Sequence, residues 1–271
     1  MLKGYTVPLS PRGEANLVSA PPWHCSGDVI ALEFWADPAA ANAILPPGVK
    51  LDPQSAGHIL ALFVDGQFTA QGDEYLEPSR HQYREFYLLV DAIYKHQPVS
   101  WTPYCFVDND SALARGHAQG QPKRLGSVFQ TRTFAAPGAA AAPICQGARF
   151  GVSASAHGQR LAEGRVTLQR EAASPPATLL RPAVNRRYFP RLAAGRHEDP
   201  AIDELVMAVH DEVKVVGTWA GDAELAFPPA HGEELRALAP LRMGPGYRFS
   251  MSASIGDLKV LEDFTVISRM G

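Results

Sequence analysis

The chain has 271 residues, 46% of them hydrophobic, and a formal net charge of −3. This length is sufficient to bury a full core, and we predict a single domain over residues 1–271. The slightly acidic balance offers no broad cationic surface for phosphates or anionic lipids, so neither nucleic acid nor a membrane is an expected partner. No apolar run approaches about 20 residues and the N-terminus lacks a secretion signal, which predicts a cytoplasmic protein.

Six segments rich in β-branched and aromatic residues show period-two alternation, which predicts strands. In chain order they are residues 28–35, 58–68, 83–94, 127–134, 214–219 and 247–255. Proline and small residues in 135–143 and 172–182 predict loops. Helical patterns do not alternate with the strands, which excludes a doubly wound parallel sheet and indicates an α+β fold that is predominantly antiparallel.

Two short helices are expected between these strands. Asp37 can cap a first helix that has proline at its first position and ends before Pro46. A second helix is predicted from Asp108 to the glycine at 116, and it delivers the chain to Lys123.

Metal, nucleotide and disulfide patterns are missing from the sequence. Cys25, Cys105 and Cys145 are far apart and form no Cys-x-x-Cys pair, so we expect free thiols buried as small hydrophobic groups. The densest group of potential ligands, 210–212, is interpreted as a solvated turn because adjacent side chains on one element diverge. With no glycine-rich phosphate loop either, we predict neither a metal nor a cofactor.

Lys123 follows Pro122 and precedes Arg124. A lysine amine attacks a carbonyl only when unprotonated, and its ordinary pKa of about 10.4 must be lowered by burial or by a nearby cation. Arg124 could be that cation, although neighbours on a strand face opposite ways, so apolar burial would do most of the shifting. On these residues alone, a solvated lysine in a turn is the more frequent alternative.

Four segments in succession resemble the motifs of the acetoacetate decarboxylase superfamily. They are Tyr-Arg-Glu-Phe at 83–86, Tyr-Cys-Phe-Val-Asp-Asn-Asp at 104–110, Ala-Leu-Ala-Arg-Gly at 112–116 and Pro-Lys-Arg-Leu-Gly at 122–126. The resemblance implies an antiparallel sheet that closes into a cone-like barrel around a buried pocket. It also implies a homo-oligomer built from dimers or tetramers, and a lysine activated as in that family.

Carried over residue by residue, the resemblance makes Lys123 the Schiff-base lysine and places Arg124 at the second lysine of the family's Pro-Lys-Lys, lining the substrate site. Glu85 matches the active-site glutamate, as proton shuttle or substrate orienter. Without the resemblance, Glu85 would be interpreted as an exposed strand carboxylate.

Two departures from the decarboxylase pattern concern the carboxylate that leaves in that reaction. Gly27 stands where decarboxylases carry an arginine, and the stretch from the glycine at 116 to Pro122 is one residue shorter. Gln119, four residues before Lys123, resembles instead the pattern of divergent branches that keep a 2-oxo acid carboxylate. We expect it to hydrogen-bond that carboxylate, with a surface loop amide as the alternative.

The leading hypothesis is therefore a Schiff-base lyase on a keto acid, which condenses pyruvate with an aldehyde and eliminates water, or hydrates an unsaturated 2-oxo acid. The alternatives are decarboxylation of acetoacetate or another β-keto acid, and a non-catalytic barrel that binds a small ligand. Tyr247 and His117 are further candidates for substrate contact. The alternatives for them are a core or interface tyrosine and a histidine that interacts with a helix terminus.

Overall fold

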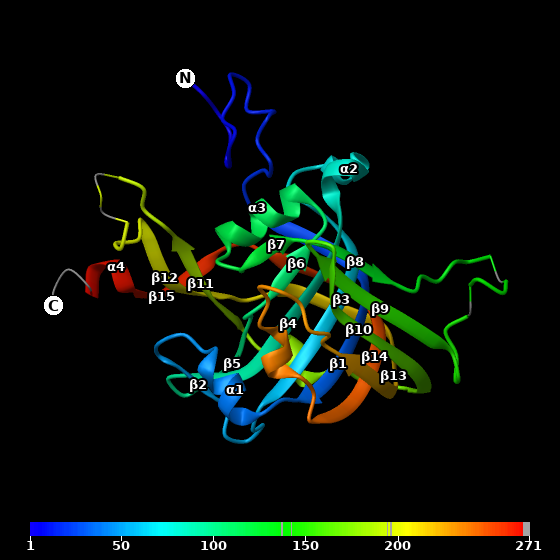
Figure 1. The fold of residues 1–271 in the computed structure, drawn as a ribbon. Helices are drawn as coiled ribbons and strands as arrows, with labels where there is room; N and C mark the ends of the chain where they lie inside the picture. The colour runs from blue at the N-terminus through cyan, green and yellow to red at the C-terminus, as the bar shows by residue number, and fades with distance from the viewer. Residues whose placement is uncertain (137, 142, 194, 196, 268–271) are drawn as a thin grey trace.

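The computed structural model describes residues 1–136, 138–141, 143–193, 195 and 197–267. Figure 1 shows a strongly curved sheet with short helices at its ends. The strands are β1 (Trp23–Trp35), β2 (Val49–Leu51), β3 (His58–Thr69), β4 (Gln82–Tyr94), β5 (Gln97–Trp101), β6 (Cys105–Val107), β7 (Lys123–Leu125), β8 (Ser127–Gln130), β9 (Arg149–Ala156), β10 (Gln159–Glu171), β11 (Ala183–Phe189), β12 (Ile202–Ala208), β13 (Asp211–Ala226), β14 (Arg242–Ile255) and β15 (Leu258–Asp263). The helices are α1 (Pro38–Ala43), α2 (Pro78–His81), α3 (Asp110–Ala118) and α4 (Phe264–Ile267), with 3-10 turns η1 (Glu74–Leu76), η2 (Ala177–Leu180) and η3 (Leu235–Leu238).

The strands form one 15-stranded sheet whose main path runs β15-β12-β11-β5-β4-β3-β1-β14-β13-β10-β9-β8. Pairing is antiparallel except between β11 and β5 and between β6 and β7. The predominantly antiparallel α+β fold is thus confirmed. The sheet curls until β8 packs across β3 and β4, but the path ends at β15 and β8, and hydrogen bonds between described strands do not close it as the barrel expectation required.

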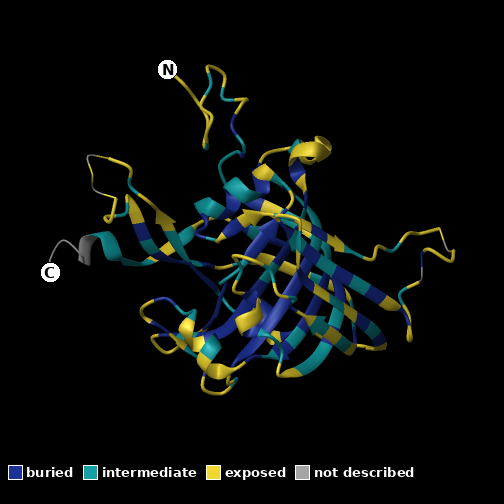
Figure 2. Cartoon of the chain, in the orientation of Figure 1, coloured by how far each residue is buried: buried dark blue, intermediate teal, exposed yellow. Residues whose placement is uncertain are grey.

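Both faces of the central strands β1, β3 and β4 are buried, as the dark blue ribbons of Figure 2 show. Residues on one face, including Phe34, Phe63 and Phe86, form the larger core, in which the Phe63 and Phe86 rings stack with centroids 4.7 Å apart. Alternate residues on the other face, including Val29 and Leu62, form a second apolar cluster. Because successive side chains alternate across a strand, the second face is free to carry a site while the first holds the fold together.

Both predicted helices are present, and their caps explain where they begin. The Asp37 side chain accepts a hydrogen bond from the Ala39 amide at the start of α1, and Asn109 accepts one from the Ala112 amide at the start of α3. The second helix extends two residues beyond the predicted glycine, to Ala118.

The six predicted strands also form, although 131–134 lies outside β8. Strands β2, β5 to β7, β9 to β12 and β15 were not predicted. β9 is built largely of glycine, alanine and serine, and charged residues interrupt β10, so neither shows strong β-propensity. The predicted loop 172–182 contains η2, and the predicted loop 135–143 lies partly outside the described residues.

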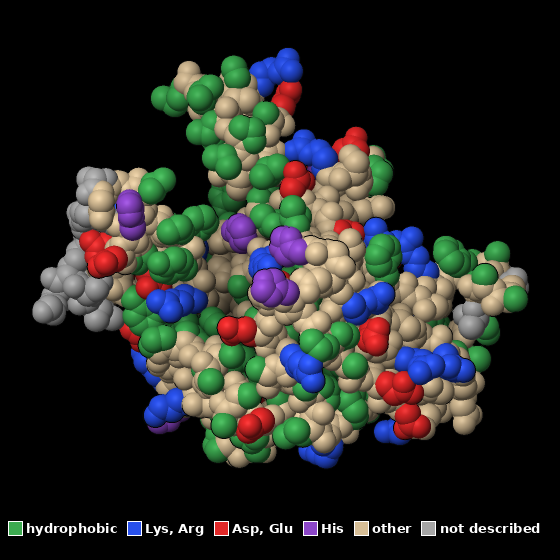
Figure 3. All heavy atoms as spheres, in the orientation of Figure 1, with side chains coloured by type: hydrophobic (Ala, Val, Ile, Leu, Met, Phe, Trp, Pro, Cys, Tyr) green, Lys and Arg blue, Asp and Glu red, His purple; other side chains and the backbone are tan. Residues whose placement is uncertain are grey.

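The surface mixes both signs of charge, and Figure 3 shows Lys and Arg interspersed with Asp and Glu on the face presented. Of the cysteines, Cys105 is buried, Cys25 is half-buried and Cys145 is exposed, so the expectation that all three are buried is wrong. None of the described helices has the length and apolar character needed to cross a membrane.

Candidate active site

The turn after α3 and the pairing of β7 place Lys123 within the fold. The Lys123 amide donates to the Gln121 carbonyl at 2.8 Å, and the His117 Nε2–H donates to the Lys123 carbonyl oxygen at 2.8 Å. β7 then pairs with β6 so that Lys123 lies beside Cys105, which in turn lies beside Tyr87 on β4. His117 therefore holds the lysine backbone from outside the cavity.

Lys123 and Glu85 form a buried pair. The distance between Lys123 Nζ and Glu85 Oε2 is 2.6 Å, and the two residues are only 3% and 6% exposed. The exposed-strand alternative for Glu85 thus does not describe this structure. At this distance a proton can pass directly between the amine and the carboxylate, which is the arrangement needed for acid–base work. Because burying two charges costs desolvation energy, the pair is better explained by a role in catalysis than by a contribution to the stability of the fold.

Gly116 makes room for the lysine side chain. A Cβ at position 116 would lie 2.2 Å from the Lys123 Cδ atom and 2.5 Å from its Cε atom. The methylene groups of the Lys123 side chain therefore pass α3 at Gly116, where the helix has no side chain.

Gly116→Ala is expected to displace the amine from Glu85 and to lower any Lys123-dependent activity by about 100-fold, because a shift of roughly 1 Å at a reacting group has this effect. Steady-state kinetics and a thermal melt would check it. Gly256→Ala is the matched control, since a Cβ there meets nothing within 4 Å. An active Gly116→Ala variant would show that the lysine position is not decisive.

Arg115 supplies a buried cation in the same cavity. It is 4% exposed, and its guanidinium lies over the rings of Phe68 and Tyr83, 4.8 Å and 5.3 Å from their centroids. Its Nη1 lies 3.2 Å from Cys25 Sγ, and its Nε has no hydrogen-bond partner. No salt bridge to a carboxylate of the described residues neutralises it, which leaves a positive charge available for an anionic ligand.

His210 lines the cavity from the connection between β12 and β13. Burial lowers the pKa of His210, and the positive charge of Arg115 lowers it further. The imidazole is therefore neutral at physiological pH and can donate or accept a proton. Interpreting 210–212 as a solvated turn was wrong for His210, because the curl of the sheet turns this connection toward the cavity.

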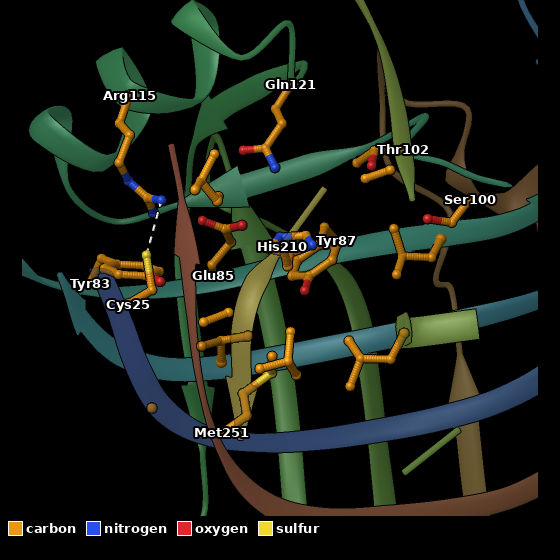
Figure 4. A pocket seen from close by; sticks show the side chains of 18 of the residues that line it. Cys25, Tyr83, Glu85, Tyr87, Ser100, Thr102, Arg115, Gln121, His210 and Met251 are labelled. Carbon is orange, nitrogen blue, oxygen red and sulfur yellow. Dashed lines mark hydrogen bonds between the residues drawn. The ribbon is translucent and has the colours of Figure 1, made fainter. Parts of the chain in front are cut away.

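These groups share a cavity of about 100 Å³. Figure 4 shows Arg115, Tyr83 and Cys25 on one side of it and Ser100 and Thr102 on the opposite side. Glu85, His210 and Tyr87 lie between the two ends. Burial raises the pKa of Tyr87 well above its ordinary value, so the phenol stays protonated. The site thus carries Arg115, which forms no salt bridge with a described carboxylate, at one end and the uncharged hydroxyls of Ser100 and Thr102 at the other; we call the latter the neutral end.

A buried ionic network supports the wall near Ser100. His58 Nδ1 lies 3.0 Å from Asp91 Oδ2, and Asp91 Oδ1 accepts from the Thr178 hydroxyl at 2.8 Å. Arg181, which lines the cavity, pairs with Asp52 at 3.0 Å and with Asp91 at 3.3 Å. The network therefore holds η2 and the residue that follows it against the cavity.

This network predicts a pH dependence of stability. Burial opposes protonation of His58, but hydrogen bonds and charges of Asp91 and Glu33 raise its pKa to about 9. Because the pKa is higher in the folded state, the contribution is fully present below the ordinary value of 6.5 and is lost as the pH rises through about 9. A pKa difference of this size corresponds to roughly 3 kcal/mol.

Urea unfolding at pH 6.5 and pH 9.5 would measure this loss. Wild type should lose stability between these pH values, and His58→Gln should lose less. His231→Gln, at an exposed histidine, should behave as wild type. Equal losses in all three proteins would contradict the assignment to His58.

The other predicted substrate contacts lie outside the cavity lining. Gln119 is buried, but its Nε2 donates to the Arg115 carbonyl at 3.1 Å, so the amide closes the end of α3. Arg124 points away from Lys123 and pairs with Glu233 at 2.8 Å. Tyr247 is half-buried on β14, and burial raises its pKa, with a smaller effect from Glu33.

Gln121 and Gly27 do line the cavity. The amide that reaches the site is thus Gln121, two residues after Gln119. A Cβ at position 27 would lie 2.8 Å from both the Asp65 carbonyl oxygen and the Gly66 Cα. The strands approach too closely there for any side chain, so an arginine could not replace Gly27 without a shift of the backbone.

The family model for acetoacetate decarboxylase matches residues 6–264. The chain belongs to the acetoacetate decarboxylase family. Among solved structures, the enduracididine biosynthesis enzyme MppR is 33% identical with a TM-score of 0.90, over 97% of this chain and 96% of MppR. Solved forms of MppR hold pyruvate, or the condensation product of pyruvate and imidazole 4-carboxaldehyde.

Two more distant structures share the fold. An acetoacetate decarboxylase-like enzyme from Sphingomonas wittichii RW1 is 24% identical, with a TM-score of 0.85 over 96% of this chain and all of that one. Acetoacetate decarboxylase from Legionella pneumophila is 18% identical, with a TM-score of 0.77 over 97% of each chain. A search of curated proteins returned no match.

Proposed function

We propose that this member of the acetoacetate decarboxylase family is a lyase that condenses pyruvate with an aldehyde through a Schiff base on Lys123 and then eliminates water. One observation carries the proposal. The buried pair of Lys123 and Glu85 shares its cavity with Arg115, a cation that no described carboxylate neutralises. A keto acid presents a carbonyl and a carboxylate to a site with these two features.

The first steps use the charged end of the cavity. Lys123 Nζ, after passing a proton to Glu85, attacks the carbonyl carbon of pyruvate, and loss of water gives an iminium. Arg115 holds the carboxylate by charge-assisted hydrogen bonds. Glu85 has by then given its proton to the departing hydroxyl group, so its carboxylate can take a proton from the methyl group. The C–H electron pair forms the C=C bond of an enamine, and the π pair of the C=N bond returns to nitrogen.

The later steps need a second proton donor. The enamine carbon attacks the aldehyde carbon, and the aldehyde oxygen must gain a proton as the C–C bond forms. Glu85 supplies this proton, the one it took from the methyl group, and then takes a second proton from the former methyl carbon. That second proton is transferred to the hydroxyl group, which leaves as water. We assign these transfers at oxygen to His210, the neutral imidazole of the cavity. Hydrolysis releases the unsaturated 2-oxo acid and free Lys123.

Retention of the substrate carboxylate is what separates this reaction from decarboxylation. Arg115 can hold a carboxylate in either reaction, but a carboxylate attached to the iminium carbon, as in pyruvate, cannot lose carbon dioxide into the C=N bond, whereas that of a β-keto acid can. The similarity to MppR, in whose structures pyruvate and a pyruvate condensation product are bound, supports the same substrate class. Hydration of an unsaturated 2-oxo acid is the last elimination run backwards and uses the same groups.

Borohydride reduction in the presence of pyruvate or acetoacetate tests the proposal. Pyruvate should leave a mass increase that peptide mapping assigns to Lys123, and pyruvate with an aldehyde should produce the absorbance of a conjugated enone. His210→Gln should retain the adduct and lose the product. Carbon dioxide release from acetoacetate without enone formation would instead indicate a decarboxylase, and a folded protein that forms no adduct would indicate a ligand-binding role.

A further inference from the structure

We propose that the neutral end of the cavity is the subsite for the second substrate, and that it selects an aldehyde carrying an uncharged group that both donates and accepts hydrogen bonds. This inference rests on the proposed function, which places pyruvate between Arg115 and Lys123. The reactive carbon then faces the opposite end of the cavity. Figure 4 shows Ser100 and Thr102 at that end.

A buried hydroxyl without a partner lies at this end. Ser100 is 1% exposed, and its Oγ has no hydrogen-bond partner, although it lines the cavity. Oε1 of Gln121, which Figure 4 places above Glu85 between the two ends, is buried and likewise unpartnered. An unpaired buried polar group has lost its hydrogen bonds to water without replacement, so a ligand that satisfies these atoms gains affinity.

Asn185 lies next to this corner, although it is not among the described residues that line the cavity. β11 runs parallel to β5 with Ala183 beside Ser100, and Ala183 lines the cavity. Asn185 lies two residues further along β11 and therefore on the same face as Ala183. It is 1% exposed, and neither its Oδ1 nor its Nδ2 has a partner.

The charge of this end indicates a neutral ligand. Arg181, the cation that lines this end among the described residues, is already paired with Asp52 and Asp91. The groups left over are hydroxyls and amides, which offer donors and acceptors without net charge. A carboxylate at the far end of the aldehyde would find no free cation here, and an alkyl group would leave the polar atoms unsatisfied.

The register of the sheet sets the length of the aldehyde. Glu85 and Leu89 face the cavity from the same side of β4, four residues apart, which is roughly 13 Å. Thr102 follows Trp101, whose partner is Val90, and so lies at the level of Leu89. An aldehyde with its polar group several bonds from the carbonyl can span this distance, whereas a two-carbon aldehyde cannot.

Three aldehydes of one shape test the proposal. With pyruvate as co-substrate, 4-formylbenzamide offers a neutral amide, 4-isopropylbenzaldehyde an apolar group of the same shape and 4-formylbenzoate an anion. We expect kcat/KM to be about tenfold or more higher for the amide than for either of the others. Equal values, or a preference for the isopropyl or carboxylate compound, would overturn the inference.

Substitutions at Ser100 and Asn185 test whether these residues cause the preference for the amide aldehyde. Ser100→Ala and Asn185→Leu should each reduce the amide-to-isopropyl ratio about threefold or more. Ser153→Ala, at a half-exposed serine of β9, should leave the ratio unchanged. Ser100→Ala removes only a hydroxyl, so it remains informative if Asn185→Leu fails to fold. A ratio that neither folded variant alters would also overturn the inference.

The pyruvate adduct separates the two proposals. An adduct on Lys123 with no amide preference refutes the subsite alone, whereas absence of the adduct refutes the Schiff-base function. In the second case, calorimetry with benzamide still tests the subsite. Binding that Ser100→Ala or Asn185→Leu weakens would support it, and binding that is absent or unchanged in both variants would refute it.

Discussion

Lys123→Gln is expected to lower turnover by a factor of about 10⁴ or more, because the chemistry then lacks its nucleophile. The borohydride adduct with pyruvate should disappear at the same time. Glutamine can still donate a hydrogen bond to Glu85, whose Oε2 now lies 2.6 Å from the amine, so the variant should fold. Intact-mass spectrometry after reduction, steady-state kinetics and a thermal melt check the three expectations.

Lys50→Gln is the matched control, since Lys50 is an exposed lysine on β2. It should retain both the adduct and full activity. Full activity in Lys123→Gln would exclude a Schiff base on this residue. Loss of activity with an adduct still present would show that borohydride had fixed pyruvate on another lysine.

Arg115→Met is expected to raise KM for pyruvate by about 10- to 100-fold, which corresponds to the roughly 1.5–3 kcal/mol of a hydrogen bond to a charged group. Methionine keeps an apolar stem against Phe68 and Tyr83, over which the guanidinium now lies. The change therefore removes mainly the charge. Steady-state kinetics with varied pyruvate at saturating aldehyde measures the effect, and kcat should change less than KM.

Two further variants serve as controls for the effect of Arg115→Met on KM. Arg165→Met removes a surface arginine whose partner is Glu224 and should leave KM unchanged. Arg115→Lys should restore only part of the pyruvate affinity, because an ammonium cannot reproduce the planar pair of donors of a guanidinium. Unchanged KM in folded Arg115→Met would move the carboxylate site elsewhere in the cavity.

Short-range signals account for most of what could be predicted. The caps at Asp37 and Asn109 depend on a hydrogen bond between residues two or three positions apart, so a sequence pattern is enough to reveal them. Lys123 and Glu85 lie within short motifs and could be assigned by resemblance. Strands such as β9 were not predicted from the sequence, because their small residues pack well only when neighbouring strands cover them.

The errors within the predicted site also have a geometric origin. Gln119 was preferred because of its distance from Lys123 along the chain, but the end of α3 turns its amide back to the Arg115 carbonyl. The next turn presents Gln121 to the cavity instead. A change of one or two residues at a helix end redirects a side chain, and sequence spacing alone does not resolve this.

The sequence by itself determined the class of fold and singled out Lys123 and Glu85, which the structure shows as a buried pair, because periodicity and short motifs are local signals. Only the tertiary structure decided which cation and which polar groups join them. Arg115 comes from a helix, His210 from a connection between strands, and Ser100 from β5, whose neighbour β11 is distant in the sequence and carries Asn185. Their meeting depends on strand register and on the curl of the sheet, which arise from long-range packing.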